Sequence, residues 1–177
     1  MDDSVKLRLI PLEPAQREIL VVNSRFIADL EFAGSVEQAR THLAKVRGLH
    51  PTATHNVPAF IIGHGNSIIT HCSDDGEPAG TAGRPALAVL QGSGLGNVSV
   101  VVTRYFGGTK LGTGGLVRAY GDAVREVLKG VRFAALLPTT ILMFVTPYRL
   151  YDQAVRLMEA HHGQILDTEF LEDITVT

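Results

Sequence analysis

The sequence has no tryptophan, a single cysteine and few aromatic residues. One cysteine, Cys72, excludes a disulfide within the chain and is typical of a reducing cytosol. Aromatic residues make up only 6% of the chain, which argues against a surface that stacks many bases. No apolar run is long enough to span a bilayer, and the N-terminus lacks a signal-peptide pattern. We therefore expect a cytoplasmic protein with no membrane partner.

The sequence also lacks an excess of positive or negative charge. Sixteen Lys and Arg residues face 18 Asp and Glu residues, so the formal net charge is -2. Bulk charge therefore excludes a general polyanion binder, and any contact with nucleic acid has to come from a local basic patch. Hydrophobic residues make up 45% of the 177 residues, which is enough to form a core in one or two domains.

Apolar patterning predicts an α+β domain over residues 1–132. Residues 18–31 hold two apolar runs separated by Asn23 and Ser24, which fits either a hairpin or one bent strand. Ser35 and Gln38 have the spacing of a capping box at the start of a helix. Further segments share the pattern of short apolar strands or helices. Strands are expected at 57–62, 67–72 and 98–103, and helices at about 85–91 and 114–129.

A second, smaller domain is expected over residues 133–177, after a boundary at 131–138. Its pattern predicts a strand at 139–146, a helix that starts at Pro147, and strands at 164–170 and 173–177. The β-α-β-β order begins a ferredoxin-like unit, which needs another helix and strand. We therefore expect a partial ferredoxin-like domain that is apparently truncated.

The stretch 98–121 is the strongest functional candidate because it contains no carboxylate. A β-branched strand leads into a glycine-rich loop and then into a helix, which is an arrangement that holds anions. It matches neither GxxxxGK[ST] nor GxGxxG, so the nucleotide loops of those types are rejected. The alternative is that the glycines only allow a tight crossover. The residues predicted to bind nucleic acid or another anion are Arg104, Tyr105, Gly107, Gly108, Lys110, Gly112, Gly114, Gly115 and Arg118.

An acidic turn, SDDGEP, is the second candidate. The carboxylates of Asp74, Asp75 and Glu77 have the chemistry to hold Mg²⁺. The alternatives are a simple turn with carboxylates at a helix start, or an internal salt-bridge network with Arg104 and Lys110.

Two long segments resemble the signature blocks of a known family. HCSDDGEPAGTAGRP at 71–85 and VVVTRYFGGTKLGTGGLVRAY at 100–120 resemble those of the IMPACT/YigZ family, also called uncharacterised protein family 0029. SRFIADL at 24–30 is similar to the family's opening block, and the segment 148–177 is similar to its small C-terminal domain. On these residues the chain is identified as a bacterial-type member.

The resemblance implies a fold and a field of activity. The N-terminal domain is expected to fold like domain 2 of ribosomal protein S5 and domain IV of elongation factor G. The C-terminal domain is expected to be ferredoxin-like. Eukaryotic members regulate translation and associate with ribosomes, whereas bacterial members have no settled activity. No catalytic residue is established for the family, so none is assigned to this chain.

Three functions remain open at this point. The leading hypothesis is a translation-associated regulatory protein, not an enzyme, that needs no cofactor. It binds RNA or the ribosome through the glycine-rich loop of the stretch 98–121, called the basic loop below. The first alternative is an enzyme acting on a phosphorylated small molecule with Mg²⁺ held by the acidic turn. The second alternative is a module that only binds a protein partner.

Overall fold

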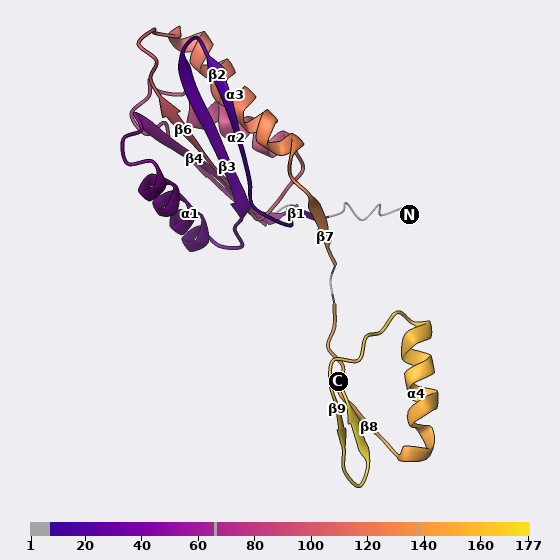
Figure 1. Cartoon of the computed structure of the whole chain (residues 1–177). Helices are drawn as coiled ribbons and strands as arrows, with labels where there is room; N and C mark the ends of the chain where they lie inside the picture. Colours follow the sequence, from indigo (N-terminus) through magenta and orange to yellow (C-terminus); the bar gives the residue numbers. More distant parts are fainter. Residues whose placement is uncertain (1–7, 66, 138) are drawn as a thin grey trace, which may run out of the picture. The chain divides into compact units, whose positions relative to one another are not determined.

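The computed structural model describes residues 8–65, 67–137 and 139–177 (Figure 1). The chain divides into two compact units between Leu136 and Leu137. Residues 1–7 of the predicted first domain lie outside the described residues. The structure is mixed α+β with antiparallel sheets, as predicted, while the likeness of each unit to a named fold stays a prediction. No helix in the described ranges has the length and apolar character needed to cross a membrane.

An antiparallel sheet of five strands forms the centre of the first unit, in the order β2-β3-β6-β4-β5. The strands are β2 (Ala15–Val21), β3 (Ser24–Phe32), β4 (His55–His64), β5 (Ser67–Cys72) and β6 (Val98–Tyr105). Of the two alternatives for residues 18–31, the hairpin is the one observed, with Val22 and Asn23 at positive φ in its turn. Strand β6 is buried along nearly its whole length, because both faces of the sheet are covered.

Helices cover the two faces of this sheet. Helices α2 (Gly83–Gly92) and α3 (Gly112–Lys129) pack on one face, and α1 (Val36–Leu49) packs on β4 and β6 from the other (Figure 1). The larger core lies between the sheet and the pair α2 and α3. Fully buried side chains in it include Phe26, Leu90, Val100, Tyr120 and Val124. Burial of each large apolar side chain contributes about 1.5–3 kcal/mol.

Helix α1 begins with the predicted cap. The hydroxyl of Ser35 accepts a hydrogen bond from the N–H of Gln38 at 3.2 Å. The Gln38 side chain accepts from the N–H of Gly34 at 2.7 Å, one residue before the position that a standard capping box uses. The two bonds fix the entry of the chain into α1.

A two-stranded antiparallel sheet joins β1 (Arg8–Pro11) and β7 (Phe133–Leu136). The sequence did not predict it, since the range 131–138 was assigned to a boundary between two domains. Strand β7 forms because a partner from the other end of the unit supplies its backbone hydrogen bonds, and no local pattern reveals such a partner.

The second unit has the predicted β-α-β-β order. It contains β8 (Phe144–Thr146), α4 (Tyr148–Ala160), β9 (Thr168–Phe170) and β10 (Ile174–Val176), with β10 central in the order β8-β10-β9. The first strand was predicted from residue 139 but begins only at Phe144. Apolar character over 139–143 was mistaken for a strand, although these residues have no strand partner.

Candidate anion-binding site

A cavity of about 380 Å³ lies where the end of β6 approaches the start of α3. Three segments that are distant in sequence meet there: the start of β4, the acidic turn, and the end of β6 with the basic loop that follows it into α3. The lining residues are Thr54, His55, Glu77, Pro78, Arg104, Phe106, Lys110, Leu111, Gly112, Thr113 and Leu116.

The register of β4 against β6 assembles this cavity. His55 lies opposite Arg104 in the antiparallel pair, so the start of β4 faces the end of β6. The backbone N–H of Thr54 donates to the carbonyl of Arg104 at 2.8 Å. The Thr54 hydroxyl in turn accepts from the N–H of Phe106 at 3.1 Å. These bonds hold the first residues of the basic loop against β4.

A buried ion pair forms one wall of the cavity. Arg104 is 5% exposed and Glu77 is 8% exposed, and Nη1 of Arg104 lies 2.6 Å from Oε1 of Glu77. The hydroxyl of Tyr120 donates to the same oxygen at 2.8 Å. Burial, and then the charge of Glu77, raises the pKa of Tyr120 far above its ordinary value. The phenol therefore stays protonated and serves as a donor to the carboxylate.

Arg104 is consequently not a free cation, which corrects the expectation that its charge is available to a ligand. Glu77 neutralises the guanidinium, as the internal salt-bridge alternative anticipated. One donor nevertheless remains, because Nε of Arg104 is buried and has no partner among the described residues. The guanidinium carbon also lies 5.5 Å from the centroid of the Phe106 ring.

The N-terminal end of α3 is open and electropositive. No side chain caps it, and its first turn contains no acidic residue. Its free N–H groups and the helix dipole therefore favour an anion at Gly112 and Thr113, which line the cavity. Lys110 is exposed beside them. Among the described residues, neither Lys110 nor Arg118 forms an ion pair with an Asp or Glu side chain.

The glycines of the loop differ in what they do. A side chain at Gly108, Gly112 or Gly114 would meet nothing within 4 Å. Gly108 and Gly112 need glycine for their positive φ, whereas Gly114 has neither a steric nor a conformational need for it. A Cβ at Gly115 would come 3.0 Å from Cβ of Leu111, so this glycine allows close packing inside the loop.

Two predicted binding residues have structural roles instead. An added Cβ at Gly107 would overlap the carbonyl oxygen of Asn23, and the N–H of Gly107 already donates to the Ser24 hydroxyl. Gly107 therefore lets the loop pack on the β2–β3 turn and offers no free donor. Tyr105 lies on the opposite face of β6 from Arg104, because side chains alternate along a strand. Its hydroxyl is 2.9 Å from Nδ1 of His50, so it does not line the cavity.

The three carboxylates of the acidic turn have separate protein partners. Asp74 accepts from the N–H groups of Gly80, Ala82 and Gly83 at the start of α2. Burial alone would raise the pKa of Asp74, but these backbone donors outweigh it and lower that pKa.

Asp75 pairs with Arg47 at 2.5 Å and accepts from the N–H of Asn56 at 2.6 Å. With Glu77 bound to Arg104, the carboxylates diverge instead of converging on one ion. The described residues hold no group of three His, Cys, Asp or Glu side chains arranged for a metal. The carboxylates of this turn therefore serve as a helix cap and in two ion pairs, and the Mg²⁺ alternative stays a prediction.

The sequence did not single out Thr54, His55 and Thr113 as site residues. His55 donates through Nδ1 to the carbonyl of Asp75 at 2.7 Å, which leaves Nε2 3.8 Å from Oε1 of Glu77. No local pattern marks Thr54 or His55, since only the strand register brings them to the loop. Phe106, which follows β6, also lies in the cavity wall.

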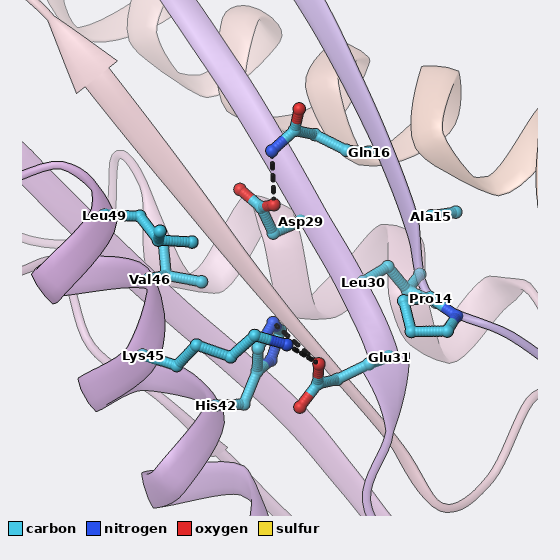
Figure 2. Close-up of a pocket in the computed structure, with 10 residues that line it drawn as sticks. All are labelled: Pro14, Ala15, Gln16, Asp29, Leu30, Glu31, His42, Lys45, Val46 and Leu49. Carbon is cyan, nitrogen blue, oxygen red and sulfur yellow. Dashed lines mark hydrogen bonds and ion pairs between the residues drawn. The ribbon is translucent and has the colours of Figure 1, made fainter.

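A smaller cavity of about 130 Å³ lies between α1 and the strands β2 and β3 (Figure 2). Lys45 binds Oε2 of Glu31 at 2.9 Å, and Nε2 of His42 lies 4.0 Å from the same oxygen. Gln16 donates to Asp29 at 2.6 Å. Burial lowers the pKa of His42 despite the nearby carboxylates. Charges here are mostly paired within the protein, so the larger cavity is the better candidate for a ligand.

The chain belongs to the family defined by the Impact N-terminal domain, which matches residues 22–128. This range runs from the β2–β3 turn nearly to the end of α3 and contains every residue that lines the larger cavity. The family identification from sequence is thereby confirmed.

Individual relatives match most of the chain. An IMPACT family member of Haemophilus influenzae is 41% identical over 167 residues, which cover 94% of this chain and 81% of the relative. The IMPACT family member YigZ of Escherichia coli is 39% identical over 163 residues, with coverages of 92% and 80%. A crystal structure of a hypothetical protein is similar with a TM-score of 0.73 and 38% identity, over 96% of this chain and 82% of that one.

Proposed function

We propose that this chain is a translation-associated regulatory protein that binds RNA, free or in the ribosome, through a phosphate at the start of α3. The observation that carries the proposal is the open, acid-free N-terminal end of α3 in a cavity wall beside the exposed Lys110. The association with translation rests on the family resemblance. The RNA ligand rests on the chemistry of the site.

Phosphate suits this site for two physical reasons. Backbone N–H groups at a helix N-terminus donate to phosphate oxygens, and the helix dipole favours the negative charge. Glycine at 108, 112 and 114 leaves open space around the backbone, so a phosphate can approach closely. Gly114 supports this most clearly, since glycine in a helix costs about 1 kcal/mol relative to alanine and no described residue lies close enough to require it there.

Lys110→Ala tests the proposal, with Lys129→Ala as the matched control. Both changes remove one exposed positive charge, but Lys129 lies at the far end of α3 and pairs with Glu126. Binding of a fluorescent RNA is measured by anisotropy at several salt concentrations. We expect Lys110→Ala to weaken binding and to reduce the slope of log K against log salt by about 0.7. Co-sedimentation with ribosomes at two salt concentrations extends the test to the assembled particle.

The control decides how the result is interpreted. Lys129→Ala should leave both the affinity and the salt slope close to those of the unchanged protein. Equal effects of the two changes would mean that bulk charge, and not the site at α3, determines binding. RNA binding that does not respond to salt would contradict the phosphate contact itself.

A further inference from the structure

We propose that the larger cavity holds one unpaired nucleobase stacked on Phe106, so that the RNA recognised is single-stranded. This inference rests on the proposed function, because it places the base of a nucleotide whose phosphate lies at the start of α3. It adds a ligand class that the basic loop alone does not define.

Phe106 has the properties of a stacking platform. Its side chain lines the cavity and the residue is 46% exposed, although it follows a strand whose other residues are almost all buried. The guanidinium of Arg104 lies near its ring, and Arg104 is itself held by Glu77. The backbone N–H of Phe106 is bonded to Thr54. The ring is thus attached to a fixed part of the molecule, and its exposed surface is available to a flat apolar ligand.

The cavity has the size and the polar groups that a single base needs. Its volume of about 380 Å³ falls in the range of small-molecule sites, roughly 300–1,000 Å³. Pro78, Leu111 and Leu116 supply apolar walls. Thr54 and His55 are polar residues of the lining, with the Thr54 hydroxyl accepting from the N–H of Phe106 and Nε2 of His55 lying 3.8 Å from Oε1 of Glu77. Such groups recognise the edge of a base, not its face.

The proposed phosphate position and the proposed base position lie in the same cavity, which favours single-stranded RNA over a duplex. Lys110, Gly112 and Thr113 line the same space as Phe106. A base reaches an aromatic platform only when it is unstacked from its neighbours and unpaired. In an A-form duplex the bases are paired and the deep groove is too narrow for side chains to read. A duplex therefore offers its phosphates to Lys110 but no base to Phe106.

A second cavity adjoins the first and offers space for the next nucleotide of the RNA strand. It has a volume of about 350 Å³ and includes Val22, Gly115, Arg118 and Asp122 in its lining, and Asp122 is paired with Arg125. Lys110 and Leu111 line both cavities, so the two spaces adjoin at this short segment. A strand with one base on Phe106 can cross Lys110 and place its next phosphate near Arg118. The chain thus has room for a short run of nucleotides, with one aromatic contact.

The test compares a labelled single-stranded oligouridylate with a duplex RNA of the same length. Phe106→Ala is the variant, Phe106→Trp restores a flat ring, and Phe133→Ala is the control, because Phe133 is also 46% exposed but lies on β7. We expect Phe106→Ala to weaken single-strand binding by about 5- to 150-fold and to leave the weaker duplex binding unchanged. Phe106→Trp should bind the single strand at least as tightly as the unchanged protein, and Phe133→Ala should bind it equally well.

The outcomes separate this inference from the proposed function. If Lys110→Ala weakens binding while both Phe106 variants bind the single strand as before, the base site is overturned and the phosphate site stands. Equal affinity for duplex and single strand would overturn the base site in the same way. If neither RNA binds the unchanged protein, the proposed function is overturned together with the inference. A thermal melt of each variant shows whether it is folded, and the comparison of single strand with duplex on the unchanged protein decides the question if Phe106→Ala is not.

Discussion

Loss of the carboxylate at Glu77 should destabilise the first unit strongly. In Glu77→Ala the guanidinium of Arg104 stays buried without its counter-charge, which typically costs about 3–5 kcal/mol. The hydroxyl of Tyr120 loses its acceptor as well, at a cost of about 1–3 kcal/mol. Water that enters from the adjoining cavity offsets part of this sum. We expect a net loss of about 4 kcal/mol in the free energy of unfolding, or a fall in Tm of roughly 10–20 °C.

Two further variants separate the charge from the shape. Glu77→Gln keeps the acceptor for Tyr120 but removes the negative charge, so it should cost less than Glu77→Ala. Arg104→Met combined with Glu77→Ala removes both charges and leaves an apolar chain of similar length. The double variant should be more stable than Glu77→Ala alone, because no unpaired charge remains buried.

Urea denaturation measures these differences in the free energy of unfolding. Unfolding is monitored by circular dichroism and by tyrosine fluorescence, because the chain has no tryptophan. Coincidence of the two probes checks that a single cooperative transition is being measured. A loss below about 1 kcal/mol for Glu77→Ala would refute the reasoning. So would a double variant whose loss equals the sum of the losses for Glu77→Ala alone and Arg104→Met alone, because the side chains would then not be coupled.

Three more changes test other parts of the structure. Gly114→Ala should stabilise the protein by about 0.5–1 kcal/mol in urea and weaken RNA binding, since it adds a methyl group at the proposed phosphate site; a gain in stability without a loss of binding would contradict that position. Gly107→Ala should cost about 2 kcal/mol or more, because the new methyl group overlaps the Asn23 carbonyl, and a neutral result in the same assay would contradict this packing. Burial lowers the pKa of His42 below its ordinary value of 6.5. As the pH falls through 6.5, the unfolded chain therefore binds a proton that the folded chain does not, and the free energy of unfolding should decrease. In His42→Gln this part of the pH dependence, measured by urea denaturation from about pH 8 to about pH 5, should be absent, and an unchanged profile would show that another group is responsible.

Local patterns predicted most of the first unit. The Ser35 cap and the buried strand at 98–103 were predicted correctly, because neighbouring residues determine each of them. For residues 18–31 the sequence left a hairpin and a bent strand open, and the pairing of β2 with β3 decides for the hairpin. The pairing of β1 with β7 was missed, because its two strands come from opposite ends of the unit and neither has a marked pattern. The range 139–143 was wrongly extended into a strand on apolar composition alone.

The candidate site was only partly predictable for a related reason. The loop and its glycines are contiguous in sequence, whereas Thr54 and His55 reach the cavity only through the β4–β6 register. Alternation along β6 did contain a signal that was not used. Arg104 continues the face of the buried Val100 and Val102, so a buried partner such as Glu77 was to be expected, and Tyr105 had to face the other way.

Titration of the isotope-labelled protein with a short single-stranded oligouridylate, followed by backbone amide NMR, tests the binding site most directly. The amides of Phe106 and of Gly108, Gly112, Thr113 and Gly114 should shift most, and the shifts should weaken with salt and in Lys110→Ala. Inorganic phosphate should move the amides at the start of α3 but leave that of Phe106 nearly unchanged. RNA binding that shifts other surfaces of the protein while these amides stay in place would contradict the account.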